Sequence, residues 1–112
     1  ELRGVGGVSD RAVLRLAESY AAAKNWDAAR QTYEVFFQRY GGSPHAAAAR
    51  YGLGGTLQNQ GKYDEAAAAY QQVIAATRAE VAARAQLAIG ACRLAQKKYP
   101  EAAAECLKAA YG

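Results

Sequence analysis

An internal repeat with a period of 36 to 37 residues restricts the fold of this 112-residue chain more than any other feature. An aromatic residue, then Asp or Pro, then an acidic or small residue, then Ala recurs at 26–29, 63–66 and 99–102. A unit of this length cannot bury an apolar face alone, so neighbouring units must stack on one another. Because the chain is also short, we expect one domain with a continuous core.

Two further columns of residues keep the same period. In the first, a large apolar residue precedes a small one, which suits helix packing because the large side chain fills the interface and the small one admits a neighbouring backbone. The second column lies seven residues after each repeated aromatic residue. We expect the large residues of the first column to be buried alike. The columns hold Leu16-Ala17, Leu53-Gly54 and Ile89-Gly90, and Tyr33, Tyr70 and Cys106.

Alanine dominates the composition, followed by other strong helix formers, and no run alternates as a strand would. The sequence therefore predicts an all-α chain. Ser9 or Asp10 should cap the first helix, and Asp27 and Asp64 should cap the second and fourth. The expected helices run over about 10–24, 27–40, 44–60 and 64–76, followed by one that starts after a break at 77–79 and one over 100–111.

These columns resemble the tetratricopeptide repeat, whose pattern reads W-x2-L-G-x2-Y, then A-x3-F, then P. The first two units match this pattern well, and the third matches less well. Val13, Arg50 and Gln86 replace the leading tryptophan, and Gly41 and Arg78 replace the closing proline. The resemblance implies a right-handed α-solenoid of three antiparallel helix pairs. Its domain would span 9–112, with repeats at about 10–43, 44–79 and 80–112, after a flexible tail at 1–8.

The repeats are two or three residues longer than the usual thirty-four. In this they resemble repeats of bacterial envelope proteins associated with the Tol-Pal system and outer-membrane assembly. The resemblance leaves a bacterial periplasmic or cytoplasmic location open. No apolar run approaches the roughly twenty residues that span a bilayer, and no signal-peptide pattern opens the sequence. We expect a soluble chain without direct membrane insertion.

The sequence shows no catalytic or metal-binding constellation. The single histidine, His45, follows Ser43-Pro44 at an expected helix start and has no partner at a suitable spacing. Cys92 and Cys106 are interpreted as small buried residues, in preference to a disulfide or a reactive thiol. Glycines 52, 54 and 55 lie within a helical pattern and lack the lysine of a phosphate loop. We therefore expect no enzymatic activity, no cofactor and no metal.

The resemblance implies that the first helix of each pair lines a concave groove that binds a protein or peptide. The lysine and asparagine clamp with which some family members bind a carboxylate is absent apart from one arginine. We expect an extended or helical peptide with apolar anchors and an acidic group near Arg84. The candidate groove residues are Arg11, Leu14, Glu18, Tyr51, Gly55, Gln58, Asn59, Arg84, Leu87 and Leu94.

Several alternatives remain open from the sequence. Tyr51, Leu87 and Leu94 would instead be buried if they pack against a neighbouring unit. The last helix could form a homo-oligomer through an apolar edge. The isoelectric point near 9.2 suggests nucleic-acid binding, but no continuous basic track exists, so we expect none. The repeated aromatics are expected to pack at the turns. The edge residues are Ala103, Cys106, Leu107 and Ala110, and the turn aromatics are Trp26, Tyr63 and Tyr99.

Overall fold

The computed structural model of the protein describes residues 9–111, which form six α-helices and no strand. The all-α prediction is confirmed, and each helix end that the sequence predicted lies within two residues of the observed one. The expected tail at 1–8 lies outside the described residues. The helices are α1 (Asp10–Ala22), α2 (Trp26–Tyr40), α3 (Ala46–Asn59), α4 (Tyr63–Ala76), α5 (Glu80–Ala95) and α6 (Tyr99–Tyr111).

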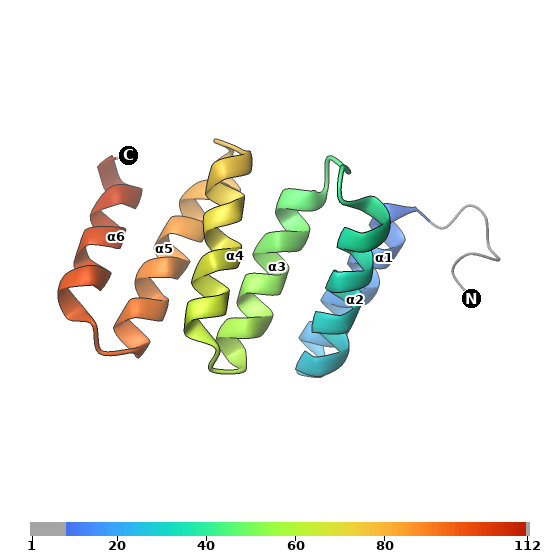
Figure 1. Ribbon diagram of the computed structural model, residues 1–112, viewed down its shortest axis with the longest axis horizontal. Helices are drawn as coiled ribbons and strands as arrows, with labels where there is room; N and C mark the ends of the chain where they lie inside the picture. The colour runs from blue at the N-terminus through green and yellow to red at the C-terminus, as the bar shows by residue number, and fades with distance from the viewer. Residues whose placement is uncertain (1–8, 112) are drawn as a thin grey trace.

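The six helices stand side by side in chain order, with α1 and α6 at opposite ends (Figure 1). Each helix packs on the next one along the chain. The first helices of the pairs also contact each other, since α3 touches both α1 and α5. Within the described residues, α2, α4 and α6 do not touch one another. The first helices therefore form the closer-packed layer of a helical repeat solenoid.

Small residues on the first helix of a pair allow the second helix to approach closely. A methyl group added at Gly54 would lie 2.6 Å from the ring of Tyr70, and one added at Gly90 would lie 2.7 Å from Sγ of Cys106. Both contacts join the two repeating columns of one pair. The large-and-small pattern of the sequence therefore reflects direct packing between α3 and α4 and between α5 and α6.

The turn inside each pair has the same backbone conformation. Lys24, Gly61 and Lys97 follow the ends of α1, α3 and α5 with φ angles of 63°, 78° and 62°. At the first turn, the N–H of Asn25 donates to the carbonyl of Tyr20 at 2.9 Å, and equivalent bonds close the other two turns. This arrangement is a Schellman motif, which satisfies carbonyl groups that a helix end would otherwise leave unpaired.

Two apolar clusters form the core. One joins α1, α2 and the start of α3 around Tyr33 and Phe36, and the other joins α3, α4 and α5 around Tyr70 and Ile89. Leu53 packs against both clusters. Each cluster thus spans a boundary between pairs, so that no helix pair has a separate core of its own.

The expectation that the large apolar column is buried alike is wrong for Leu16, which is 40% exposed, whereas Ile89 is 1% exposed. Leu53 and Ile89 pack in clusters that include the second helix of the preceding pair. No helix of the described chain precedes α1, so the corresponding face of α1 is open to solvent.

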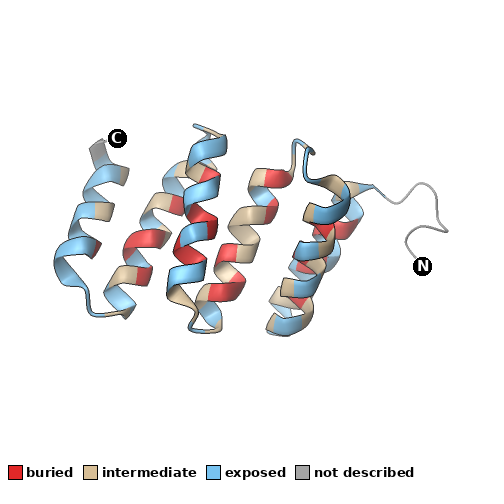
Figure 2. Cartoon of the chain, viewed as in Figure 1, coloured by how far each residue is buried: buried red, intermediate tan, exposed pale blue. Residues whose placement is uncertain are grey.

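The opposite end of the chain shows the same effect. Tyr99, expected to pack at a turn, is 58% exposed, and Cys106, expected to be buried, is exposed. Their counterparts Tyr63 and Tyr70 pack in or against the second cluster, which includes α5. Figure 2 shows α6 as almost wholly exposed, in contrast to the buried stripe on α4. No described helix follows α6 to cover these side chains.

The aspartates expected to cap helices have another role. Asp27 and Asp64 lie in the first turns of α2 and α4, but neither helix has a side-chain cap. Asp27 instead accepts a hydrogen bond from Nε2 of Gln60 at 2.8 Å, and Asp64 accepts one from Nε2 of Gln96 at 3.0 Å. Both glutamines end the first helix of the next pair, so these bonds join successive repeats. Ser9 caps α1 as expected.

Candidate functional site

The open side of α1, α3 and α5 is the surface on which the sequence placed a groove. Arg84 and Ala91 lie two turns apart on one side of α5, and Gln86 points roughly 200° away from Arg84 toward the layer of second helices. Two columns on this side have at least partly exposed residues in every pair. We call the six residues of these two columns the inner face. They are Arg11, Ala48 and Arg84 in one column and Glu18, Gly55 and Ala91 in the other; Gly55 is half-buried and the other five are exposed.

The expectation that Leu14 lines the groove is wrong, because this side chain is 8% exposed and belongs to the first apolar cluster. Its repeat counterparts become more exposed along the chain. Tyr51 is half-buried, and Leu87 is 52% exposed. The first helix of the next pair contacts α1 and α3, whereas no further first helix follows α5 in the part of the chain that the structure describes. This column therefore marks the contact between pairs, and the exposure of Leu87 follows from its place at the end.

The four candidate residues on α3 form contacts within the chain, three through their side chains and Gly55 through its carbonyl group. The hydroxyl of Tyr70 donates to Oε1 of Gln58 at 2.8 Å, and the ring of Tyr70 packs against that of Tyr51 with centroids 5.6 Å apart. Burial is the main cause that raises the pKa of Tyr70 far above its ordinary value. Nδ2 of Asn59 donates to the carbonyl of Gly55 at 2.8 Å. The middle of the surface is thus held in place by its own hydrogen bonds.

Half of the six inner-face residues are charged: Arg11, Glu18 and Arg84. Arg84 forms an ion pair with Glu80 at 3.3 Å, and both side chains are largely exposed, so the pair adds little stability. Glu18 is exposed on α1, and its charge adds to the effect of burial that raises the pKa of Tyr33 to about 12. Leu94, at the end of α5, is 56% exposed. The inner face therefore combines three small residues, two arginines and one glutamate, and the exposed Leu87 and Leu94 lie on the same helix as Arg84.

Within residues 9–111, no group of three or more His, Cys, Asp and Glu side chains could hold a metal ion. Cys92 is buried, as expected, and its burial raises the pKa of its thiol. None of the described helices combines the length and the apolar character that crossing a bilayer requires.

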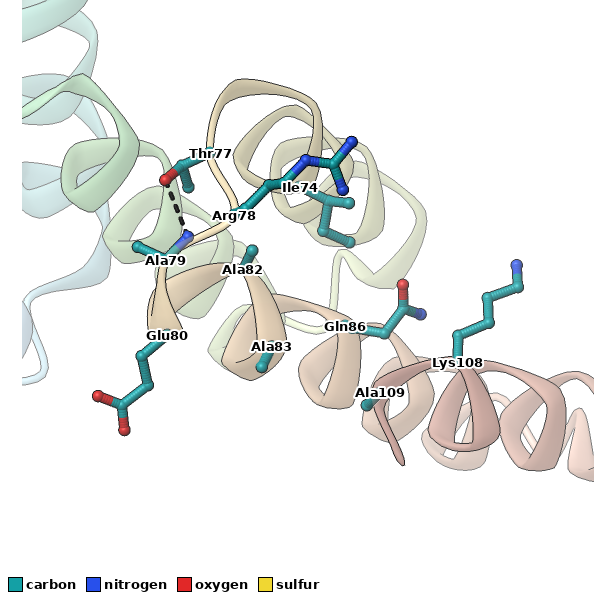
Figure 3. A pocket seen from close by; sticks show the side chains of 10 residues that line it. All are labelled: Ile74, Thr77, Arg78, Ala79, Glu80, Ala82, Ala83, Gln86, Lys108 and Ala109. Atoms are coloured by element: carbon teal, nitrogen blue, oxygen red, sulfur yellow. Dashed lines mark hydrogen bonds between the residues drawn. The ribbon is translucent and has the colours of Figure 1, made fainter. Parts of the chain in front are cut away.

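Sequence reasoning missed two pockets that lie between the second helices. One, of about 360 Å³, is bounded by α4, the 77–79 turn, α5 and α6 (Figure 3). The other, of about 250 Å³, lies between α2, α3 and α4. Neither pocket contains any of the ten candidate groove residues. A comparison of repeats at the same columns would have indicated the first pocket, because Phe37, Tyr40 and Arg50 at the first boundary become Ile74, Thr77 and Gln86 at the second.

Comparison with known protein families gave two matches along the chain. A family model described as tetratricopeptide repeat matches residues 10–79, and a second model with the same description matches residues 56–112. Together they cover the six helices, and they confirm the resemblance seen in the repeat columns. No curated protein matches the chain.

Proposed function

Because the chain belongs to the tetratricopeptide repeat family, whose members generally mediate protein–protein interactions, we propose that it is a non-catalytic scaffold that binds a peptide along the inner face. The observation that carries this proposal is that the two inner-face columns stay open in all three pairs. Leu14 and Tyr51, which pack between pairs, are buried or half-buried where a following pair exists. The inner-face residues on the same two helices are exposed, apart from the half-buried Gly55.

The composition of the inner face indicates what it would bind. Ala48, Gly55 and Ala91 leave room for another backbone to approach, as small residues do at helix contacts. Arg11 and Arg84 occupy the same position in the first and third repeats, and both are exposed. A helical or extended segment with an acidic residue near either arginine would suit this surface.

Selection of peptides on the folded protein, followed by substitution, tests this proposal. Peptides selected from a random library should lose binding by at least tenfold to an Arg11→Glu, Ala91→Glu double variant. A matched control, the Arg39→Glu, Ala104→Glu double variant, makes the same two kinds of substitution at exposed positions of α2 and α6. Circular dichroism should show equal helicity in all three proteins. Peptides that bind the double variant as well as the unchanged protein would refute an inner-face site.

A second candidate function, self-association, is favoured by the two ends of the array. Leu16 is exposed at one end, and Ala103, Cys106, Leu107 and Ala110 are exposed at the other. Within the chain, the α4 counterparts of Ala103 and Cys106 are Ala67 and Tyr70, and both are buried in the cluster that includes α5. The counterpart of Ala110, Ile74, packs against the same cluster. Two copies stacked head to tail would repeat that contact, and such contacts form open chains of copies when the rotation does not close a ring.

Light scattering as a function of concentration distinguishes these candidates. Head-to-tail stacking predicts a mass that rises with concentration and falls back to the monomer in an Ala103→Glu, Ala110→Glu variant. A constant monomer mass at millimolar concentration would exclude self-association and leave the peptide-binding proposal unaffected.

A further inference from the structure

The pocket between α4, α5 and α6 lies away from the inner face and has no role in the function proposed above. Its volume of about 360 Å³ falls at the lower end of the range for small-molecule and side-chain pockets, roughly 300–1,000 Å³. Half of its lining residues are alanine or isoleucine, and the other half are polar or charged. The lining residues are Ile74, Thr77, Arg78, Ala79, Glu80, Ala82, Ala83, Gln86, Lys108 and Ala109.

At the equivalent position between the first and second pairs lie an aromatic ring and a guanidinium group, neither of which lines the pocket of about 250 Å³ at that boundary. The ring of Phe37 on α2 meets that of Phe36 edge to face, with centroids 5.7 Å apart. The guanidinium carbon of Arg50 on α3 lies 4.9 Å from the centroid of the Phe37 ring, within cation–π range. Nε of Arg50 also donates to Oε1 of Gln72 on α4 at 3.0 Å. These contacts connect three helices at the first boundary.

The repeat equivalents of those three residues all line the pocket. Ile74 stands in the column of Phe37, Gln86 in that of Arg50 and Lys108 in that of Gln72. At the neighbouring position, Thr77 replaces Tyr40, whose ring packs against Phe36 with centroids 5.8 Å apart. The second boundary therefore lacks the two rings and the guanidinium that occupy the first, and the space remains open. Compared with the first boundary, the second boundary therefore has space for an aromatic side chain.

The rim of the pocket favours an anion next to that aromatic group. Figure 3 shows Arg78 extended beside Ile74 and Lys108 directed to the same side, while Glu80 points away. Glu80 is paired with Arg84, and Lys108 lies 3.4 Å from Glu105. Within residues 9–111, the structure gives Arg78 no hydrogen bond or ion pair. Arg78 is thus the cation at this rim that remains available to a carboxylate.

We propose that this pocket binds an aromatic side chain from a partner peptide, with an adjacent Asp or Glu whose carboxylate meets Arg78. The aromatic ring takes the place that Phe37 has at the first boundary. A single ring and one exposed charge pair contribute little binding free energy, so the isolated dipeptide unit should bind with a Kd on the order of 1 mM. A longer peptide should bind more tightly.

Titration of the ¹⁵N-labelled protein with a short probe tests this site directly. The probe acetyl-Phe-Glu-amide should shift the backbone amide signals of Thr77, Ala79, Ala83 and Ala109, and leave those of Arg11 and Ala48 unchanged. Acetyl-Phe-Lys-amide should bind about two- to fivefold more weakly, as expected for the loss of one exposed ion pair. Acetyl-Ala-Glu-amide should cause no saturable shift.

Two substitutions test the residues that define the site. Ile74→Phe restores the residue found at the first boundary and should abolish the shifts without lowering the unfolding temperature. Arg78→Gln should reduce the affinity for acetyl-Phe-Glu-amide to that for the lysine probe. If Ile74→Phe fails to fold, Ala83→Leu blocks the same pocket from an exposed position of α5.

Shifts centred on any other surface, or equal binding of the alanine and phenylalanine probes, would overturn the proposal, as would unchanged binding to a folded pocket-filling variant. The peptide-binding proposal for the inner face is tested by substitutions at Arg11 and Ala91, neither of which lines this pocket. The two proposals can therefore fail independently.

Discussion

Three glycines within four positions of α3 have different environments. A methyl group at Gly52 would overlap the hydroxyl of Tyr33 from the preceding pair, and one at Gly54 would lie 2.6 Å from Tyr70. At Gly55 the nearest atom is the hydroxyl of Tyr70 at 3.8 Å, an ordinary contact distance. Gly52 and Gly54 are thus required by packing, whereas Gly55 is not.

Alanine substitutions should therefore have opposite effects at these positions. Gly55→Ala should stabilise the protein by about 0.5–1 kcal/mol, because alanine favours the helix. Gly52→Ala and Gly54→Ala should each destabilise it by about 1–3 kcal/mol, because Tyr33 and Tyr70 are almost fully buried and must move. Urea unfolding of the three variants checks these signs. A stabilising Gly54→Ala would contradict the packing described for α3 and α4.

Lysine occupies two of the three left-handed turn positions. Gly61 adopts its φ of 78° without steric cost, whereas Lys24 and Lys97 hold φ near 60° with a Cβ atom present. Lys24→Gly and Lys97→Gly should each raise the free energy of unfolding by about 0.5–1 kcal/mol. The matched control, Gly61→Ala, should lower it by about the same amount. Thermal unfolding of these variants measures the difference, and a loss of stability in both lysine variants would refute this account of the turns.

Bonds between successive pairs recur along the chain. Asp27 in α2 accepts a hydrogen bond from Gln60 at the end of α3, and Asp64 in α4 accepts one from Gln96 at the end of α5. Asp64 also accepts a hydrogen bond from Arg93 at 2.9 Å. In the third pair, Pro100 takes the position of the aspartate, and no further first helix follows in the described chain. The acidic residue is therefore present wherever a following pair needs to be joined.

The charge of Asp64 should make stability depend on pH. Hydrogen bonds from Gln96 and then from Arg93 lower the pKa of Asp64 below its ordinary value of 3.8. The contribution of Asp64 is complete above pH 3.8 and is lost as the pH falls through the lowered pKa, because the unfolded chain takes up the proton first. Asp64→Asn should weaken this dependence in denaturant titrations between pH 2 and 5.

Asp10, whose pKa is lowered chiefly by a hydrogen bond from Ser43, acts in the same direction. Part of the pH dependence should therefore remain in Asp64→Asn and disappear when Asp10→Asn is added. An unchanged acid titration in the double variant would show that other carboxylates dominate the acid stability.

At the scale of the whole molecule, the position of a repeat in the array decides how deeply its columns are buried. Leu16, Leu53 and Ile89 are equivalent in sequence, yet only the latter two pack on a preceding pair. The same rule exposes Leu87 and Cys106 at the other end. The solenoid has no separate core for each repeat, so the end repeats are the least covered.

Alanine substitution along this column should reveal the difference. Ile89→Ala should destabilise the chain by about 2–5 kcal/mol, as removal of a buried side chain does. Leu16→Ala should have an effect of about 1 kcal/mol or less, because this side chain is already partly solvated. Chemical unfolding at micromolar concentration checks both values. Equal losses would mean that the exposed face of α1 is covered in solution.

The sequence alone determined the helices, their pairing and the family. The period of 36 to 37 residues, the aromatic turn residues and the large-and-small columns depend on local helix geometry, which the order of residues encodes directly. Those features predicted all six helices, the close packing at Gly54 and Gly90 and the open positions Arg11 and Arg84.

Only the tertiary structure decided which members of a column are covered. Leu14, Tyr51 and Leu87 occupy the same column of the repeat pattern. Their burial differs because it depends on whether another helix packs beyond each of them, which only the stacked arrangement of helices decides. The pocket at the second boundary has the same origin. It exists because Ile74, Gln86 and Lys108, which lie on three different helices, meet at one place and together leave space that Phe37 and Arg50 fill at the first boundary.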